Sequence, residues 1–137
     1  MSDNPRQNDG GQNLTRTAEY RLTMLQRAGG AFTAAQVKSM LGCTSAENVR
    51  EAVAAHRLLA VDVTGVMLFP AFQFDENRVV PGMAAVLSAA PKTNPWAVLQ
   101  FFVAGDEGLG DDLPMDLVKG GRDDIARASR FARTLEC

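Results

Sequence analysis

The apolar residues of this chain fall into short blocks that repeat at helical spacing and end at Gly or Pro. The first block runs from residue 14 to residue 28 and ends at Gly29-Gly30. One face of this block carries Leu14, Ala18, Leu22 and Leu25, and polar or basic residues occupy the opposite face. Such a stripe predicts an amphipathic helix that packs against the rest of the protein, and glycine often ends such a helix.

Two short helices are predicted next from their end signals. Thr33 with Gln36 three residues later has the capping-box pattern, so a helix should start after Thr33 and end at Gly42. Thr44 with Glu47 repeats the pattern and predicts a second helix. Two short helices joined by a tight turn form a helix-turn-helix, whose second helix can enter the major groove of DNA.

A β-hairpin is predicted directly after these helices. The β-prone runs 58–63 and 66–69 are separated by Thr64-Gly65, a suitable two-residue turn. A hairpin in this place is typical of a winged helix, although a helix pair followed by a hairpin can also form without binding DNA. If DNA is bound, the expected contacts are to base edges from Asn48 and Arg50 and to phosphates from Lys38 and Arg57.

Proline and glycine divide the second half of the chain. The aromatic segment 70–80 reads as a linker, and Pro81 opens a helix that ends at Pro91. Asn94-Pro95 starts another helix, because Asn is a favoured N-cap and Pro fits the first helical position, and Gly105 ends it. Pro114 and Gly120-Gly121 delimit a short helix, and the last helix should begin near Arg122.

These elements predict a mainly α protein. We expect a small helix-turn-helix domain with a short β-hairpin wing, followed by a compact helical C-terminal domain. The expected divisions are a disordered tail (1–13), a winged-helix-like domain (14–69), a linker (70–80) and a helical domain (81–137).

Composition and charge narrow the classes of function. The chain has 137 residues, is 46% hydrophobic and carries a formal net charge of −2, so nucleic-acid binding would have to come from a local basic face. No apolar run approaches the roughly 20 residues of a membrane helix. The polar N-terminus does not resemble a signal peptide, and we expect a cytoplasmic protein with two reduced thiols, Cys43 and Cys137.

Catalytic chemistry has little support in the residue pattern. The single histidine, His56, stands at a predicted helix end and cannot anchor a metal cluster. The acidic run between Asp106 and Asp116 does not match the spacing of an EF-hand loop and is typical of solvated helix caps. There is no phosphate-binding loop after a strand and no GxSxG motif. We therefore expect no enzyme activity, metal or cofactor.

A family resemblance appears in the second half of the chain. Its signature is Pro95-Trp96, Phe101-Phe102, Gly108-Leu109-Gly110, Leu113-Pro114-Met115-Asp116-Leu117, Gly120-Gly121 and a closing helix with Ile125 and Ala128. This spacing resembles the toxin-binding domain of Xre/MbcA/ParS-type antitoxins. The segment from Phe69 to Phe74 resembles the linker that precedes that domain, and the resemblance covers residues 33–135.

The resemblance implies a type II antitoxin whose C-terminal domain binds and blocks a RES-domain toxin, an enzyme that consumes NAD. It also implies a homodimer and repression of its own operon through operator DNA. Carried over by position, the toxin-binding residues are Leu113, Pro114, Asp116, Leu117, Arg122, Arg127, Arg130 and Arg133. Pro114 and the motif glycines would be structural, and the arginines would make the contacts, since arginine forms forked hydrogen bonds to carboxylates.

An alternative reading keeps the N-terminal half as the active part. In it the protein is a stand-alone winged-helix DNA-binding regulator whose C-terminal helices only dimerise. The N-terminal half is shorter than an Xre-type helical bundle and has the predicted wing in its place, a difference that leaves DNA recognition open.

Overall fold

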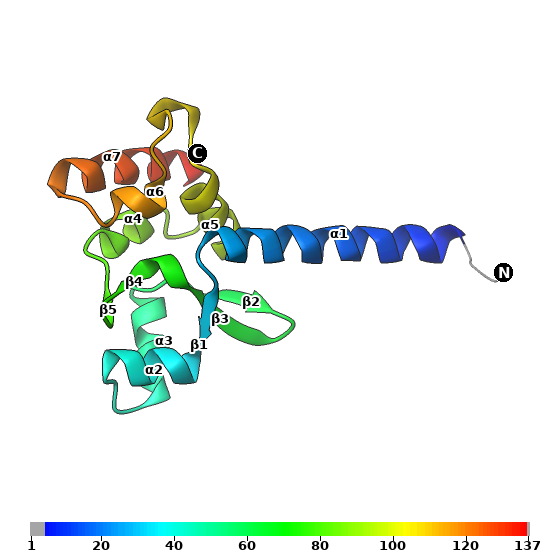
Figure 1. Ribbon diagram of the computed structural model, residues 1–137, viewed down its shortest axis with the longest axis horizontal. Coiled ribbons are helices and arrows are strands. Elements are labelled where there is room, and N and C mark those ends of the chain that lie inside the picture. The colour runs from blue at the N-terminus through cyan, green and yellow to red at the C-terminus, as the bar shows by residue number, and fades with distance from the viewer. Residues whose placement is uncertain (1–4, 137) are drawn as a thin grey trace.

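The computed structural model describes the backbone of residues 5–136 and the side chains of residues 16–136 (Figure 1). The protein is mainly helical, with two small antiparallel sheets in the described range. The helices are α1 (Pro5–Arg27), α2 (Ala34–Leu41), α3 (Ala46–Ala54), α4 (Met83–Ala89), α5 (Pro95–Ala104), α6 (Pro114–Leu117) and α7 (Arg122–Ala132). The strands are β1 (Ala31–Thr33), β2 (Val61–Val63), β3 (Val66–Pro70), β4 (Phe74–Asp75) and β5 (Arg78–Val79), and 3₁₀ turns cover Ala71–Gln73, Glu107–Leu109 and Arg133–Glu136.

Helix α1 is longer than predicted and projects away from the body of the molecule (Figure 1). It begins at Pro5, whereas the sequence predicted a disordered tail over 1–13, and residues 1–4 lie outside the described residues. Proline fits a first helical position, and each residue added to an existing helix gains a hydrogen bond. Among the α1 side chains that the structure describes, residues 16–27, Met24 and Leu25 near the C-terminal end are buried. The predicted apolar face is thus only partly covered, since Leu22 remains 57% exposed.

The helix pair is confirmed, with one shift in a cap. Thr33 and Gln36 form both bonds of the predicted capping box of α2, and Gly42 ends that helix in the left-handed conformation, with φ 70°. At α3 the N-cap is Ser45 and not Thr44. The side-chain oxygen of Asn48 accepts hydrogen bonds from the hydroxyls of Thr44 and Ser45 and from the Ser45 backbone N–H. The predicted second helix therefore starts one residue later.

The predicted hairpin forms, and a third strand joins it. Strands β2 and β3 pair antiparallel around Thr64-Gly65, and both turn residues have positive φ, 48° and 87°, as a tight hairpin turn requires. Strand β1 pairs with the other edge of β3, with Phe32 opposite Phe69, so the sheet order is β1-β3-β2. The segment before Thr33 is thus a strand that local patterning did not indicate.

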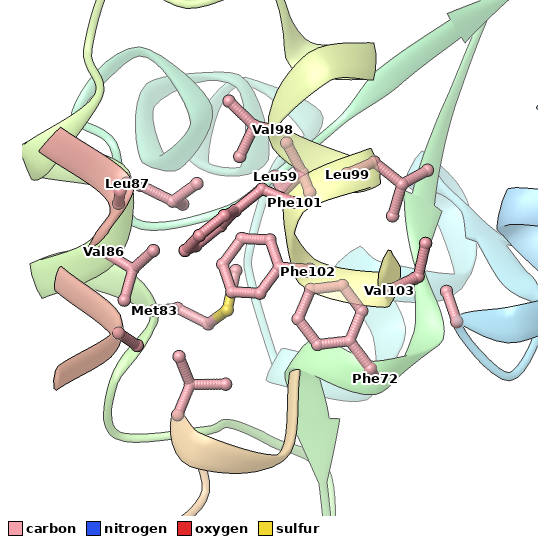
Figure 2. Close-up of a cluster of buried hydrophobic side chains, with 14 of the residues drawn as sticks. Leu59, Phe72, Met83, Val86, Leu87, Val98, Leu99, Phe101, Phe102 and Val103 are labelled. Carbon is pink, nitrogen blue, oxygen red and sulfur yellow. The ribbon is translucent and has the colours of Figure 1, made fainter. Parts of the chain in front are cut away.

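Residues 70–80 belong to the core and do not act as a linker. Phe72 and Gln73 are buried, and β4 and β5 form a second small hairpin within this segment. Figure 2 shows Phe72 and Leu59 among the side chains of α4 and α5, including Met83 and Phe102. The ring centroids of Phe72 and Phe102 lie 4.7 Å apart. One hydrophobic cluster therefore joins residues from both predicted domains.

The C-terminal helices begin and end close to the Pro and Gly positions that predicted them. The Asn94 side chain accepts a hydrogen bond from the Trp96 backbone N–H, with Pro95 as first residue of α5. Helix α4 begins at Met83 and not at Pro81, because residues 81 and 82 form a turn. In the described part of the chain, no helix combines the length and apolarity needed to cross a membrane.

Candidate functional site

The short helix α6 holds the residues that carry the family resemblance. Pro114 is among the largest fully buried side chains, Leu117 is 6% exposed, and Leu113 is half-buried. Four of the expected binding residues lie in this helix or at its N-cap, and of these only Asp116 is exposed. Pro114 and Leu117 therefore build the platform, and a direct partner contact from this motif has to come from Asp116 or the exposed part of Leu113.

Helix α7 is packed onto that platform through small side chains. Ala128 and Ala132 are fully buried, and α7 packs against α4. The Arg127 guanidinium donates to an Asp112 carboxylate oxygen at 3.0 Å, which ties the loop before α6 to the helix. In the same loop, Gly108 lies against the Phe131 ring so closely that a Cβ there would overlap the ring. The Arg127 guanidinium is thus paired with the loop before α6 through Asp112.

The opposite face of α7 is open to solvent. Arg122, Ala126, Arg130 and Arg133 are exposed, and their four- and three-residue spacings place them on one side of a helix. Among the described residues, neither Arg122 nor Arg130 forms an ion pair. Of the predicted toxin contacts, the structure therefore brings Arg122, Arg130 and Arg133 together on one surface and sets Arg127 apart.

The four predicted DNA contacts lie at the other end of the molecule, around α2 and α3 (Figure 1). Arg50 is exposed but pairs with Glu47 at 3.3 Å. Asn48 is exposed, and its side-chain oxygen accepts hydrogen bonds from the Ser45 backbone N–H and hydroxyl at the start of α3. Lys38 is half-buried and Arg57 is exposed just after α3. The hairpin 61–70 carries Asp62 and no Lys or Arg, so it offers no cation to a phosphate.

A groove that the sequence did not indicate lies between α1 and the hairpin. It has a volume of about 400 Å³ and is lined mainly by apolar or neutral side chains, among them Ala18, Leu22 and Val63. Beside it the Arg21 guanidinium lies 4.9 Å from the centroid of the Trp96 ring. The Trp96 indole N–H donates to the backbone oxygen of Asp62 at 3.3 Å. Trp96 is therefore a half-buried link between α1, the hairpin and α5.

Metal-ligating residue types occur in the described chain without forming a cluster. No group of three or more His, Cys, Asp or Glu side chains among these residues is placed to hold a metal ion. His56 has φ 59° and lies two residues after the end of α3, where the Arg57 N–H donates to the Ala52 oxygen. The predicted Cys43 thiol is free and half-buried, and Cys137 lies outside the described residues.

No family model, curated protein or solved structure matches the chain, so its function has to be inferred from its own residues and their geometry.

Proposed function

We propose that this protein is the antitoxin of a type II toxin-antitoxin pair and that its C-terminal helices bind and block a RES-type, NAD-degrading toxin. The observation that carries this proposal is the difference in solvent exposure between the motif residues of α6 and the arginines of α7. Residues of the resemblance motif such as Pro114 and Leu117 are buried, and the arginines of the next helix are presented to solvent. A rigid platform with an exposed arginine face suits a protein interface, where arginine is enriched among the residues that dominate binding.

The proposed mechanism is steric and needs no chemistry from this chain. A toxin that consumes NAD must admit the dinucleotide through an opening in its surface. A protein that seats on the rim of that opening inhibits by excluding the substrate. Loop 106–112 helps to hold α7 ready for such seating, because the Asp112–Arg127 ion pair and the Gly108–Phe131 contact fix it to the helix. Preorganisation of this kind lowers the entropic cost of binding.

Co-expression tests the proposal directly. The product of the neighbouring gene is expressed alone and together with this chain in a bacterial host, and growth and cellular NAD are followed. We expect loss of NAD and arrested growth for the neighbour alone, recovery on co-expression, and a complex that co-elutes on gel filtration. A neighbour that is not toxic, or one that is toxic but neither rescued nor bound, would refute the proposal.

We propose a second activity, DNA binding by a winged helix, because of the topology of the N-terminal half. The order α1-β1-α2-α3-β2-β3 and the sheet order β1-β3-β2 place a helix pair beside a three-stranded sheet whose hairpin follows the second helix. The surface charge favours it less, since exposed α3 residues Glu47 and Glu51 accompany Arg50 and the hairpin has no cation.

A mobility-shift assay on the protein's own promoter separates this second activity from the first. Arg50→Ala should weaken the shift at least about tenfold if Arg50 reads a base, and toxin neutralisation should be unchanged. Arg78→Ala removes an exposed arginine from β5 and serves as the matched control. Absence of any shift for the unaltered protein would leave toxin binding as the only proposed activity.

A further inference from the structure

The exposed face of α7 carries a row of like charges around one small residue. Arg122, Ala126 and Arg130 follow one another at four-residue intervals, and Arg133 continues the row in the next turn. We call these four residues the arginine row. With a rise of about 1.5 Å per residue, successive members Arg122, Ala126 and Arg130 are about 6 Å apart along the helix axis. Ala126 leaves room for another backbone to approach between the guanidinium groups.

Two of the carboxylates close to α7 have other partners. Asp112 pairs with Arg127, and both carboxylate oxygens of Glu136 accept hydrogen bonds, from the Lys92 backbone N–H and the Thr93 hydroxyl. Asp124 is half-buried and lies against Gly120 at the start of the helix. Within the described chain, Arg122 and Arg130 are left without an ion pair. The row is thus a local cationic surface on a protein of net charge −2.

We propose that the arginine row docks an acidic helical segment of the partner protein, with carboxylates eight residues apart that pair with Arg122 and Arg130 across Ala126. This proposal rests on the proposed function, for which the partner is the toxin, and it states the chemistry of the surface that the toxin must offer. The spacing of the carboxylates on such a helix matches that of the guanidinium groups. Arginine holds carboxylates through two parallel hydrogen bonds, which fixes the register as well as the attraction.

The charges around the row favour a protein partner over nucleic acid. Asp123 follows Arg122 directly and is exposed on the same side of α7 as Arg130, and Asp116 is exposed on α6, which packs against α7. A polyphosphate backbone brings a continuous line of negative charge and is repelled by these carboxylates. An acidic protein segment carries discrete charges that can be placed opposite the arginines and away from the aspartates.

Charge reversal tests the proposal with the full chain. The probe is the neighbouring gene's product, and its affinity is measured by calorimetry for the unaltered protein, for Arg122→Glu/Arg130→Glu and for Arg78→Glu/Arg16→Glu. The second pair is the matched control, with the same change in charge at two exposed arginines outside α7. We expect the first pair to weaken binding at least about a hundredfold and the control less than about threefold. Arg122→Lys/Arg130→Lys keeps the charge and loses the paired hydrogen bonds, so it should weaken binding less than the charge reversal does and more than the control does. Circular dichroism verifies that each variant is folded.

The outcomes distinguish this proposal from the proposed function. If the neighbour binds the first pair as tightly as the control, the arginine row is not the docking surface, while the antitoxin function stands. If the neighbour binds no form of the protein, the antitoxin function fails. The row is then tested with a synthetic helical peptide that carries Glu at three positions four residues apart, against the same peptide with Gln. Equal binding of both peptides overturns the proposal. Binding of duplex DNA that is tighter than that of the Glu peptide and is lost on charge reversal also overturns it.

Discussion

Gln73 is a fully buried polar side chain that joins two parts of the chain, and its removal should cost much of the stability. The Leu59 backbone N–H donates to the side-chain oxygen of Gln73 at 2.8 Å. Its amide nitrogen donates to the backbone oxygens of Leu59 at 2.9 Å and Pro70 at 3.0 Å. Gln73→Met keeps the length and approximate volume of the side chain and removes all three bonds.

The expected loss follows from what the substitution leaves behind. A buried backbone N–H without a partner costs about 1–3 kcal/mol, and each lost bond to a carbonyl costs about 0.5–1.5 kcal/mol. Burial of the apolar Met offsets about 1 kcal/mol of this. The free energy of unfolding should therefore fall by about 1–5 kcal/mol, a large share of the roughly 5–15 kcal/mol typical of a domain.

Urea unfolding measures this loss, followed by the fluorescence of the single tryptophan, Trp96, and by far-ultraviolet circular dichroism. Gln100→Met is the matched control, because Gln100 is exposed on α5 and should change the stability by less than about 0.5 kcal/mol. A loss below about 1 kcal/mol for Gln73→Met would refute the reasoning, since it would mean that the Leu59 and Pro70 groups find other partners.

Three further substitutions probe packing, an unpaired hydroxyl and a helix cap. Gly82→Ala would place a Cβ 2.7 Å from the Cα of Val118, so the melting temperature should fall by an amount equivalent to about 1–3 kcal/mol; an unchanged melting temperature would contradict the close approach. The Ser129 hydroxyl oxygen is buried without a hydrogen-bond partner, so Ser129→Ala should stabilise the protein by about 1 kcal/mol in urea unfolding, and a loss of stability would show that the hydroxyl is bonded. Thr33→Ala removes the acceptor of the Gln36 N–H and should cost about 1 kcal/mol in the same measurement, whereas Thr33→Ser should cost less than half of that; equal losses would speak against the cap.

The candidate site was only partly predictable, because its residues are sorted by contacts across the fold. The sequence places Arg122, Arg127 and Arg130 on one helix and assigns them one role. The structure separates them, since Arg127 meets Asp112 fifteen positions away in the chain. Asn48 has the chemistry to read a base, yet its oxygen is used by a cap. Residue type states what a side chain can bind, and only its neighbours decide what remains available to a partner.

The sequence by itself determined where most helices begin and end. Thr33, Gly42 and the Asn94-Pro95 pair act through backbone groups within a few residues, so their effect can be predicted without knowledge of the fold. Tertiary structure decided the rest. Strand β1 exists because Phe32 pairs with Phe69, and residues 70–80 enter the core because Gln73 bonds to Leu59. These partners are far apart along the chain, and no local pattern of apolar and polar positions records which of them will meet.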